Sequence, residues 1–281
     1  MNQSSNKQIM IQGLNIFYSE HGEGTPVFAL HGTPGSSRTF EKLGAYLGQC
    51  GCRLVIPDRL GYENNLKIPC FIEENYISTG IYSEMIKKLC ENSAYIIGYS
   101  LGCYHALKIA CTYPEKVKGL ILVAPYIYLK KKVKPSPIPK IARNPFAYKI
   151  LNSISAVITK KLLKNHFIRT YKPDKPTGEK LKELINKYGK LDTVLSILSD
   201  KNEMIEDPLE AEKLRNVTCP CFVIAGDKDS VVDSGSQIDF LNKTLKKLIV
   251  KRYEGAGHKL FFQKYEDIAK LIINIIESKE E

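Results

Sequence analysis

The 281-residue chain has no tryptophan and no long apolar run. Its longest apolar stretches, such as residues 120–124, have the length of a strand and are far too short to cross a bilayer. The first eight residues are polar and lead into a strand-like pattern, whereas a secretion signal would need an apolar segment there. We therefore expect a cytoplasmic protein without a membrane span.

The eight cysteines also lack the spacings of a metal or disulfide framework. They form no paired Cys-x-x-Cys sets and have no histidines at zinc-finger spacing. Cys219 and Cys221 stand in a strand-like run beside Phe222. We expect reduced cysteines that serve as small core residues, and no metal site.

Acidic residues are scarce in one central segment. Residues 126–190 contain 17 Lys and Arg but only three Asp and Glu, a local charge of +14, although the whole chain carries +11. The segment is either a solvated face or a surface that attracts an anionic substrate or makes transient contact with an anionic membrane. No recognition motif accompanies the charge, so we expect no nucleic-acid partner.

Strand-like and helix-like patterns alternate on both sides of this segment. A hairpin is predicted at 9–19, strands at 27–30, 53–57, 94–98, 120–124, 221–225 and 248–253, and helices at 37–48, 76–92, 101–113, 234–245 and 261–278. This order predicts an α/β fold, a mostly parallel central sheet with helices on both faces. The alternation stops at 126–207, which is basic, contains prolines and is mostly helical in its later parts. We predict a core domain of residues 1–125 and 208–281, with 126–207 inserted above the carboxyl edge of the sheet, where such folds bind ligands.

The segment Gly98-Tyr99-Ser100-Leu101-Gly102 matches G-x-S-x-G. The pattern is weak alone, but here it lies between a predicted strand and a predicted helix, the setting of a nucleophile elbow. The glycines suit unusual backbone angles and a close approach of helix and strand. The helix amino terminus would also favour negative charge beside the serine. Ser100 is therefore the predicted nucleophile.

A serine nucleophile needs a base to remove its proton, and the base needs an acid to orient it. His258 stands in a loop after the last predicted strand, the position that the chain order Ser, Asp, His requires. The other four histidines are His21, His31, His105 and His166. Asp227 and Asp229 follow the strand at 221–225, and we prefer Asp229 because it is further along the loop. Asp227 is interpreted as a turn residue.

An oxyanion hole needs two backbone N–H groups. Leu101, directly after the nucleophile, is one predicted donor. The other is Thr33, in the turn His31-Gly32-Thr33-Pro34-Gly35 after the first buried strand, where Gly32 would let the backbone approach a substrate.

With these elements the chain resembles the α/β-hydrolases over nearly its whole length. The matching segments are His31-Gly32-x-Pro34-Gly35, Pro57-Asp58-Arg59-x-Gly61, Gly98-x-Ser100-x-Gly102, Gly226-x-x-Asp229 and Gly257-His258. The resemblance implies the same Ser100, Asp229 and His258, the same two N–H donors, and a helical cap at 126–207.

The predicted reaction is hydrolysis of a carboxylic ester, or a related acyl bond, of a small and partly apolar molecule through an acyl-enzyme, without a cofactor. Haloalkane dehalogenases and epoxide hydrolases carry aspartate where Ser100 stands. The elbow is more similar to those of esterases and carbon–carbon bond hydrolases. Three alternatives stay open: a proline-iminopeptidase-like peptidase, although Thr33 departs from that subgroup; an acyltransferase or perhydrolase; and a non-catalytic receptor for a small ligand.

Apolar residues recur at helical spacing in the predicted cap, at Ile150, Ile154, Val157, Ile158 and Leu162. The stripe either packs on the core or forms the roof of a substrate pocket. In both interpretations the neighbouring lysines, Lys160, Lys161 and Lys164, are exposed.

Overall fold

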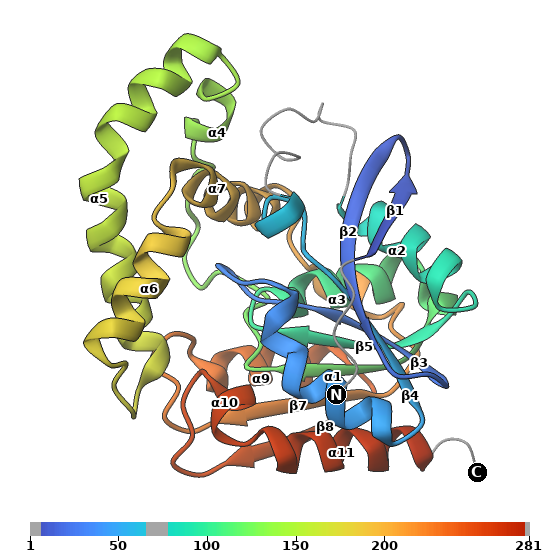
Figure 1. Cartoon of the computed structure of the whole chain (residues 1–281). Coiled ribbons are helices and arrows are strands. Elements are labelled where there is room, and N and C mark those ends of the chain that lie inside the picture. The colour runs from blue at the N-terminus through green and yellow to red at the C-terminus, as the bar shows by residue number, and fades with distance from the viewer. Residues whose placement is uncertain (1–6, 66–77, 279–281) are drawn as a thin grey trace.

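The computed structural model describes residues 7–65 and 78–278, without the side chains of 155–158 (Figure 1). Eight strands form one sheet in the order β1-β2-β4-β3-β5-β6-β7-β8. They are β1 (Lys7–Ile11), β2 (Leu14–His21), β3 (Thr25–Leu30), β4 (Cys52–Pro57), β5 (Ala94–Tyr99), β6 (Val117–Val123), β7 (Cys221–Gly226) and β8 (Leu248–Tyr253). The β1–β2 and β2–β4 pairs are antiparallel and all others are parallel, which confirms the predicted α/β-hydrolase fold and its amino-terminal hairpin.

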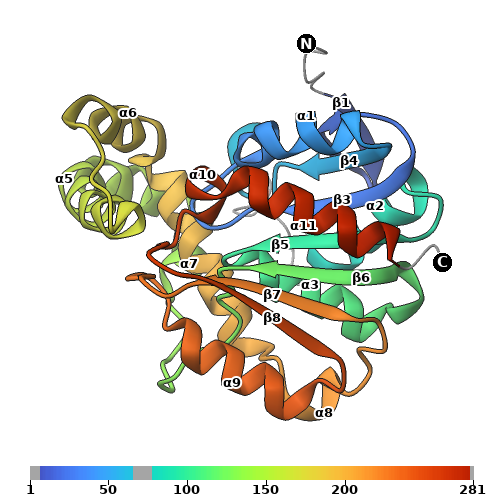
Figure 2. The ribbon, with the colours of Figure 1, turned by 90° about the horizontal axis from the view of Figure 1, so that it is seen from below.

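Helices cover both faces of this sheet. The covering helices are α1 (Glu41–Gln49), α2 (Ser78–Leu89), α3 (Gly102–Thr112), α9 (Ser234–Thr244) and α11 (Tyr265–Glu277). In Figure 2, α1 and α11 lie on one face of the sheet, and α3 and α9 lie on the other. Along β3, Val27 and Ala29 pack with the cluster of α1 and α11, whereas Phe28 and Leu30 pack with that of α2, α3 and α9. Successive side chains of a strand point to opposite faces, so a strand buried on both faces is apolar throughout.

Two of the predicted helices differ in detail. The closing helix predicted at 261–278 is two helices, α10 (Leu260–Gln263) and α11, separated at Lys264. The break lets the side chain of Gln263 accept a hydrogen bond from the N–H of Gly257 at 2.9 Å. The helix predicted from Ser37 begins as a 3₁₀ turn, and residues 76–77 of the predicted 76–92 helix lie outside the described residues.

Helices fill most of the sequence between β6 and β7, within the segment predicted as a cap (residues 126–207, here the cap segment). They are α4 (Ile138–Ile141), α5 (Pro145–Tyr171), α6 (Gly178–Tyr188) and α7 (Leu191–Glu206), followed by the short α8 (Ala211–Leu214). The helix α5 begins where the side chain of Asn144 accepts the backbone N–H groups of Phe146 and Ala147. Figure 1 shows α5 on the outer side of the molecule, beside α6 and away from the sheet.

The cap segment has small apolar clusters of its own. Leu163 and Phe167 of α5 are buried against Tyr188 at the end of α6. Leu191 and Leu195 of α7 are buried in another cluster, with Ala142 after α4. The long helix is therefore held to the other helices of the cap segment by one face.

Both interpretations of the apolar stripe on α5 are wrong for the side chains that the structure describes. Ile150, Ile154 and Leu162 are 49%, 60% and 62% exposed, so they neither pack on the core nor cover a pocket. The other two predicted members, Val157 and Ile158, lie outside the described side chains. The physical reason is that Leu163 and Phe167 occupy the packing face, which leaves the exposed residues without a neighbouring element.

The seven described cysteines form no disulfide with one another, in agreement with the prediction of reduced thiols. Five of them, Cys52, Cys90, Cys103, Cys111 and Cys221, are buried. Burial raises the pKa of the Cys90 thiol to about 12, which keeps it protonated and unreactive. Cys70 lies outside the described residues.

Replacing Gly102 by alanine should destabilise the fold, because a Cβ there would lie 2.0 Å from the carbonyl oxygen of Leu30. We expect the free energy of unfolding in urea to fall by roughly 2 kcal/mol or more. The control is Gly178→Ala at the start of α6, where a Cβ would meet nothing within 4 Å and should change stability little. Equal stabilities of the two variants would contradict a close contact between α3 and β3.

Candidate active site

Ser100 occupies a sharp turn between β5 and α3. Its φ of 53° is in the left-handed region, which residues other than glycine seldom adopt. The turn is held because its N–H donates to the carbonyl of Val123 at 2.9 Å. The unusual angle predicted for the glycines falls instead on the serine, and Gly98 and Gly102 serve the close approach: a Cβ on Gly98 would lie 2.6 Å from Cys103 Cα. This strained conformation is typical of functional sites.

The structure brings Ser100, His258 and Asp229 together in one hydrogen-bonded row. Ser100 Oγ donates to His258 Nε2 at 3.0 Å, and His258 Nδ1 donates to Asp229 Oδ2 at 2.7 Å. The other Asp229 oxygen accepts the N–H groups of Val231 and Val232 at 2.8 and 2.9 Å. Only 5% of the His258 side chain and 1% of the Asp229 side chain are exposed. The contacts select the imidazole tautomer that leaves Nε2 free to accept the serine proton.

The loop that carries His258 is held from two sides. Tyr99 donates its hydroxyl proton to the carbonyl of His258 at 3.0 Å from the core side. The end of α5 presses from the cap side, since a Cβ on Gly257 would lie 1.7 Å from the Lys172 carbonyl oxygen. Asp227 makes no comparable contact: its N–H donates to Tyr253 at the strand end, in keeping with the predicted turn.

The two segments predicted to supply oxyanion donors flank Ser100. Leu101 follows it directly and precedes the first residue of α3. Gly32 of the 31–33 loop is so close that a Cβ there would lie 2.9 Å from Ser100 Cβ. Thr33 follows in the same loop. Both residues therefore lie beside Ser100, where backbone N–H groups could form an oxyanion hole. That they bind an oxyanion stays a prediction.

His31 holds the 31–33 loop in shape. The ring is fully buried; Nδ1 donates to the carbonyl of Gly32 at 2.8 Å, and Nε2 accepts the N–H of Arg59 at 2.9 Å. Burial, with the Arg59 charge adding to it, keeps the pKa of His31 well below its ordinary value. His31 is therefore a neutral structural histidine.

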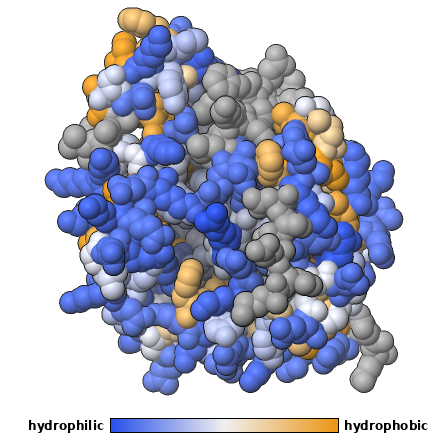
Figure 3. Space-filling view, in the orientation of Figure 1, coloured by the Kyte–Doolittle hydropathy of each residue, from blue (hydrophilic) through white to orange (hydrophobic). Residues whose placement is uncertain are grey.

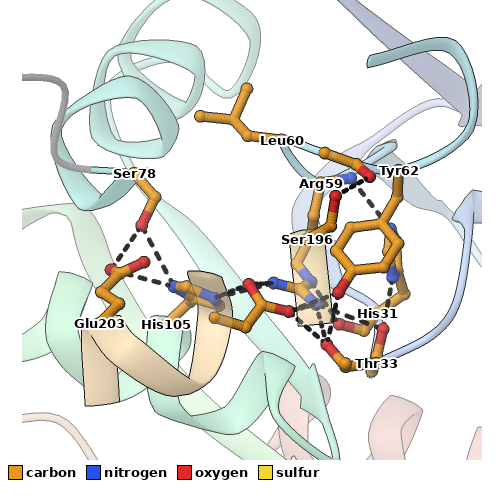
Figure 4. Close-up of polar contacts among 12 residues, drawn as sticks. His31, Thr33, Arg59, Leu60, Tyr62, Ser78, His105, Ser196 and Glu203 are labelled. Carbon is orange, nitrogen blue, oxygen red and sulfur yellow. Dashed lines mark hydrogen bonds and ion pairs between the residues drawn. The ribbon is translucent and has the colours of Figure 1, made fainter. Parts of the chain in front are cut away.

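A buried ion pair joins this loop to the cap segment (Figure 4). The Arg59 side chain is 1% exposed and meets Asp200 of α7 through two parallel contacts, Nη1–Oδ1 at 3.0 Å and Nη2–Oδ2 at 2.9 Å. Arg59 also donates to the carbonyls of His31 at 2.8 Å and Gly32 at 3.3 Å. One guanidinium thus holds both the loop beside Ser100 and a helix of the cap segment.

Two hydroxyl groups complete the surroundings of the Asp200 carboxylate. Thr33 Oγ1 donates to it and accepts from Arg59, and Tyr62 donates to it at 2.6 Å. Burial opposes ionisation of Asp200, but Arg59 more than offsets this, so the pKa of Asp200 is lowered well below its ordinary value. The sequence marked Arg59 only as part of a motif. The sequence contained no signal for Asp200, because an acidic residue in a predicted surface helix is normally expected to be exposed to solvent.

His105 extends the network, away from Ser100. Its Nε2 accepts from Arg59 at 2.8 Å, and its Nδ1 lies 3.2 Å from the Ser78 hydroxyl, which donates to Glu203 of α7 at 2.8 Å. This histidine, which the sequence placed only in the helix after the elbow, forms a second polar link between the core and α7.

Two basic residues stand beside the His258 loop. Burial, together with the charges of His258, Arg169 and Lys259, lowers the pKa of His166, on α5, to about 4. Burial also lowers the pKa of Lys259 to about 7, and its ammonium lies 3.5 Å from the ring centre of Tyr171. The sequence assigned His166 to the insertion without a role, and the fold of α5 brings it to this side of the site.

In residues 7–65 and 78–278, no three His, Cys, Asp or Glu side chains converge in a group that could hold a metal ion. The expectation that side chains alone carry the reaction stays a prediction.

Asp200→Asn should strongly destabilise the protein, because Arg59 would keep a buried charge without its counter-charge. We expect a loss of about 3–5 kcal/mol in the free energy of unfolding at neutral pH, measured in urea. Glu206→Gln, an exposed carboxylate replaced at the end of the same helix, should change it by less than about 0.5 kcal/mol. A small effect of Asp200→Asn would show that the pair does not hold α7 on the core.

His166 should make stability depend on pH. Its folded pKa of about 4 lies below the ordinary value of 6.5, so between these values the unfolded chain binds more protons. The free energy of unfolding should therefore rise from pH 4 to 6.5. Above pH 6.5 the contribution of His166 should be constant. In His166→Gln the rise should be smaller, by on the order of 2 kcal/mol. Asn165→Gln, an exposed neighbour, should keep the wild-type slope, and identical slopes in both variants would contradict the burial of His166.

Comparisons with known proteins identify relatives that share this fold. The family model described as "Serine aminopeptidase, S33" matches residues 24–265. A Synechocystis protein named "Putative non-heme chloroperoxidase" is 20% identical over 94% of this chain and 95% of its own length. A 2-hydroxy-6-oxo-6-phenylhexa-2,4-dienoate hydrolase of Comamonas testosteroni is 28% identical, over 39% of this chain and 40% of its own.

Solved structures show the same fold. The esterase EaEST of Exiguobacterium antarcticum superposes with a TM-score of 0.76 at 19% identity, covering 97% of this chain and 100% of that one. The epoxide hydrolase CorEH superposes with a TM-score of 0.74 at 17% identity, covering 97% and 98%. Because the family model matches most of its length, the chain belongs to the S33 serine aminopeptidase family of the α/β-hydrolase superfamily.

Proposed function

We propose that this α/β-hydrolase is a serine hydrolase that cleaves a carboxylic ester, or a related acyl bond, of a small and partly apolar substrate. The observation that carries the proposal is the buried row Ser100–His258–Asp229, with hydrogen bonds of 3.0 and 2.7 Å. Hydrogen-bonded nucleophile, base and orienting acid are the arrangement that activates a serine.

In the proposed mechanism, Ser100 Oγ attacks the carbonyl carbon while its proton passes to His258 Nε2. Asp229 stabilises the imidazolium that forms, and the N–H groups of Thr33 and Leu101 hold the oxyanion. The tetrahedral intermediate expels the alkoxide, which takes the proton from His258, and an acyl-serine remains. A water molecule then gives a proton to His258 and attacks the acyl carbon, and collapse returns that proton to Ser100 as the acid leaves.

The groups around His258 favour a neutral or anionic acyl group. Arg169 and Lys259 contribute positive charge on the side of α5, where they lower the pKa of His166. The relative from Comamonas testosteroni acts, by its name, on a carboxylate, a dienoate. Attraction between such a charge and these basic residues would favour the binding of an acidic substrate.

The family description favours a second candidate, an aminopeptidase. Such an enzyme must bind the ammonium of a peptide amino terminus near the scissile bond, and basic residues beside His258 oppose this. Turnover of amino-acid p-nitroanilides above that of p-nitrophenyl esters would decide for the peptidase. Stimulation by alcohols or by peroxide would indicate an acyltransferase or a perhydrolase, and ligand binding without turnover would indicate a receptor.

Ser100→Ala should abolish labelling by a fluorophosphonate and lower the turnover of p-nitrophenyl acetate, butyrate and octanoate by ~10⁴-fold or more, since the nucleophile is gone. The dependence on chain length would show the size of the acyl pocket. Ser153→Ala, an exposed serine on α5, is the matched control and should label and turn over as the wild type does. A folded wild-type protein that neither labels nor turns over esters would overturn the proposal.

A further inference from the structure

The outer face of α5 carries large apolar side chains in water. Phe146, Ile150 and Ile154 follow one another at intervals of four residues, which places them on one side of the helix, and Phe146 is 72% exposed. Ile141 of α4, 50% exposed, precedes them. We call Ile141, Phe146, Ile150 and Ile154 the apolar row. In Figure 3, hydrophobic surface gathers at the upper left, over α4 and the start of α5, with hydrophilic residues around it.

This exposure is not explained by packing inside the protein. Leu163 and Phe167 attach α5 to α6 by another face of the helix. In the described part of the chain, no helix or strand covers the apolar row (Figure 1). Contiguous apolar surface with a polar rim is typical of an interaction site, since each such side chain would be more stable away from water.

The rim is basic. Residues 116–173 contain no Asp or Glu, and 130–172 contain twelve Lys and Arg. Five of these, Arg143, Lys149, Lys160, Lys161 and Lys164, are exposed on or next to α5. The 27 residues of α5 include five Lys and Arg and no Asp or Glu, so the helix carries a net positive charge.

These features together identify the occupant. We infer that α5 docks on an anionic phospholipid surface, with the apolar row at the boundary between headgroups and acyl chains and the basic residues against the phosphates. A second copy of this chain would bring two positive faces together, and a nucleic acid would leave the apolar row in water. None of the described helices is long and apolar enough to cross a membrane.

The inference goes beyond the proposed hydrolase activity and does not require it, because no catalytic residue belongs to the surface. Binding is therefore measured on the full-length Ser100→Ala protein, which cannot form the acyl-serine. The assay is co-sedimentation with vesicles of phosphatidylcholine alone and of phosphatidylcholine mixed with phosphatidylglycerol. We expect binding to the mixed vesicles only, and weaker binding as salt rises.

The apolar part is tested by the triple replacement Phe146→Ser, Ile150→Ser and Ile154→Ser. We expect the partition coefficient on mixed vesicles to fall by at least ~10-fold, since three side chains would no longer be buried in lipid. The matched control, Met10→Ser with Ile249→Ser, replaces side chains that are 58% and 57% exposed elsewhere and should bind as the parent does. Unchanged urea midpoints would exclude misfolding as the cause.

The charged part is tested by replacing Lys160, Lys161 and Lys164 with glutamine, which should weaken binding by at least ~10-fold. The control replaces three other exposed lysines, Lys243 near the end of α9 and Lys246 and Lys247 just after it, and removes the same total charge. If both triple variants lost the same binding affinity, the attraction would depend on net charge alone, and the proposed docking surface would be overturned. Equal binding to neutral vesicles, no binding at low salt, or self-association through the apolar row would also overturn it.

Discussion

The buried pair of Arg59 and Asp200 is the interaction on which the arrangement of the site depends. Burying two charges is costly unless they form an ion pair and make further hydrogen bonds. Here the guanidinium of Arg59 pairs with Asp200 and also donates to the carbonyls of the 31–33 loop. The position of α7 and the shape of the loop beside Ser100 are therefore coupled through one guanidinium. The hydroxyl of Ser196, which donates to the Gly61 carbonyl at 2.7 Å, adds a further link.

The cap segment reaches the other side of Ser100 as well. The carboxyl end of α5 lies against Gly257, next to His258, and the Arg169 side chain donates to the carbonyl of Ser230 in the loop of Asp229. The cap segment thus meets the rest of the chain on both flanks of Ser100, through a charge pair on one flank and backbone contact on the other. A shift of the cap segment would therefore move both the proposed oxyanion loop and the proposed base, His258. The opposite face of α5 takes no part in these contacts, which leaves its apolar row and basic residues for a partner.

Much of the fold and of the candidate site could be predicted because the signals are local or follow chain order. Alternating strand and helix patterns led to the sheet, and the G-x-S-x-G segment in its strand–turn–helix setting led to Ser100. His258 and Asp229 followed from their positions after strands, since the carboxyl ends of parallel strands meet at one edge. The expectations for the stripe on α5 and for an unbroken closing helix failed, because periodicity shows that a face is apolar without showing what packs on it.

The sequence by itself determined the α/β core, the elbow, and the order of serine, acid and histidine, since each depends on residues close along the chain or on a rule of topology. Only the tertiary structure decided that Asp200, 141 positions from Arg59, is the partner of that arginine, and that His31 and His105 are structural. It also decided which face of α5 is buried. Pairing between distant side chains and the choice of a packing face depend on how whole elements approach in space, which residue types and spacing do not encode locally.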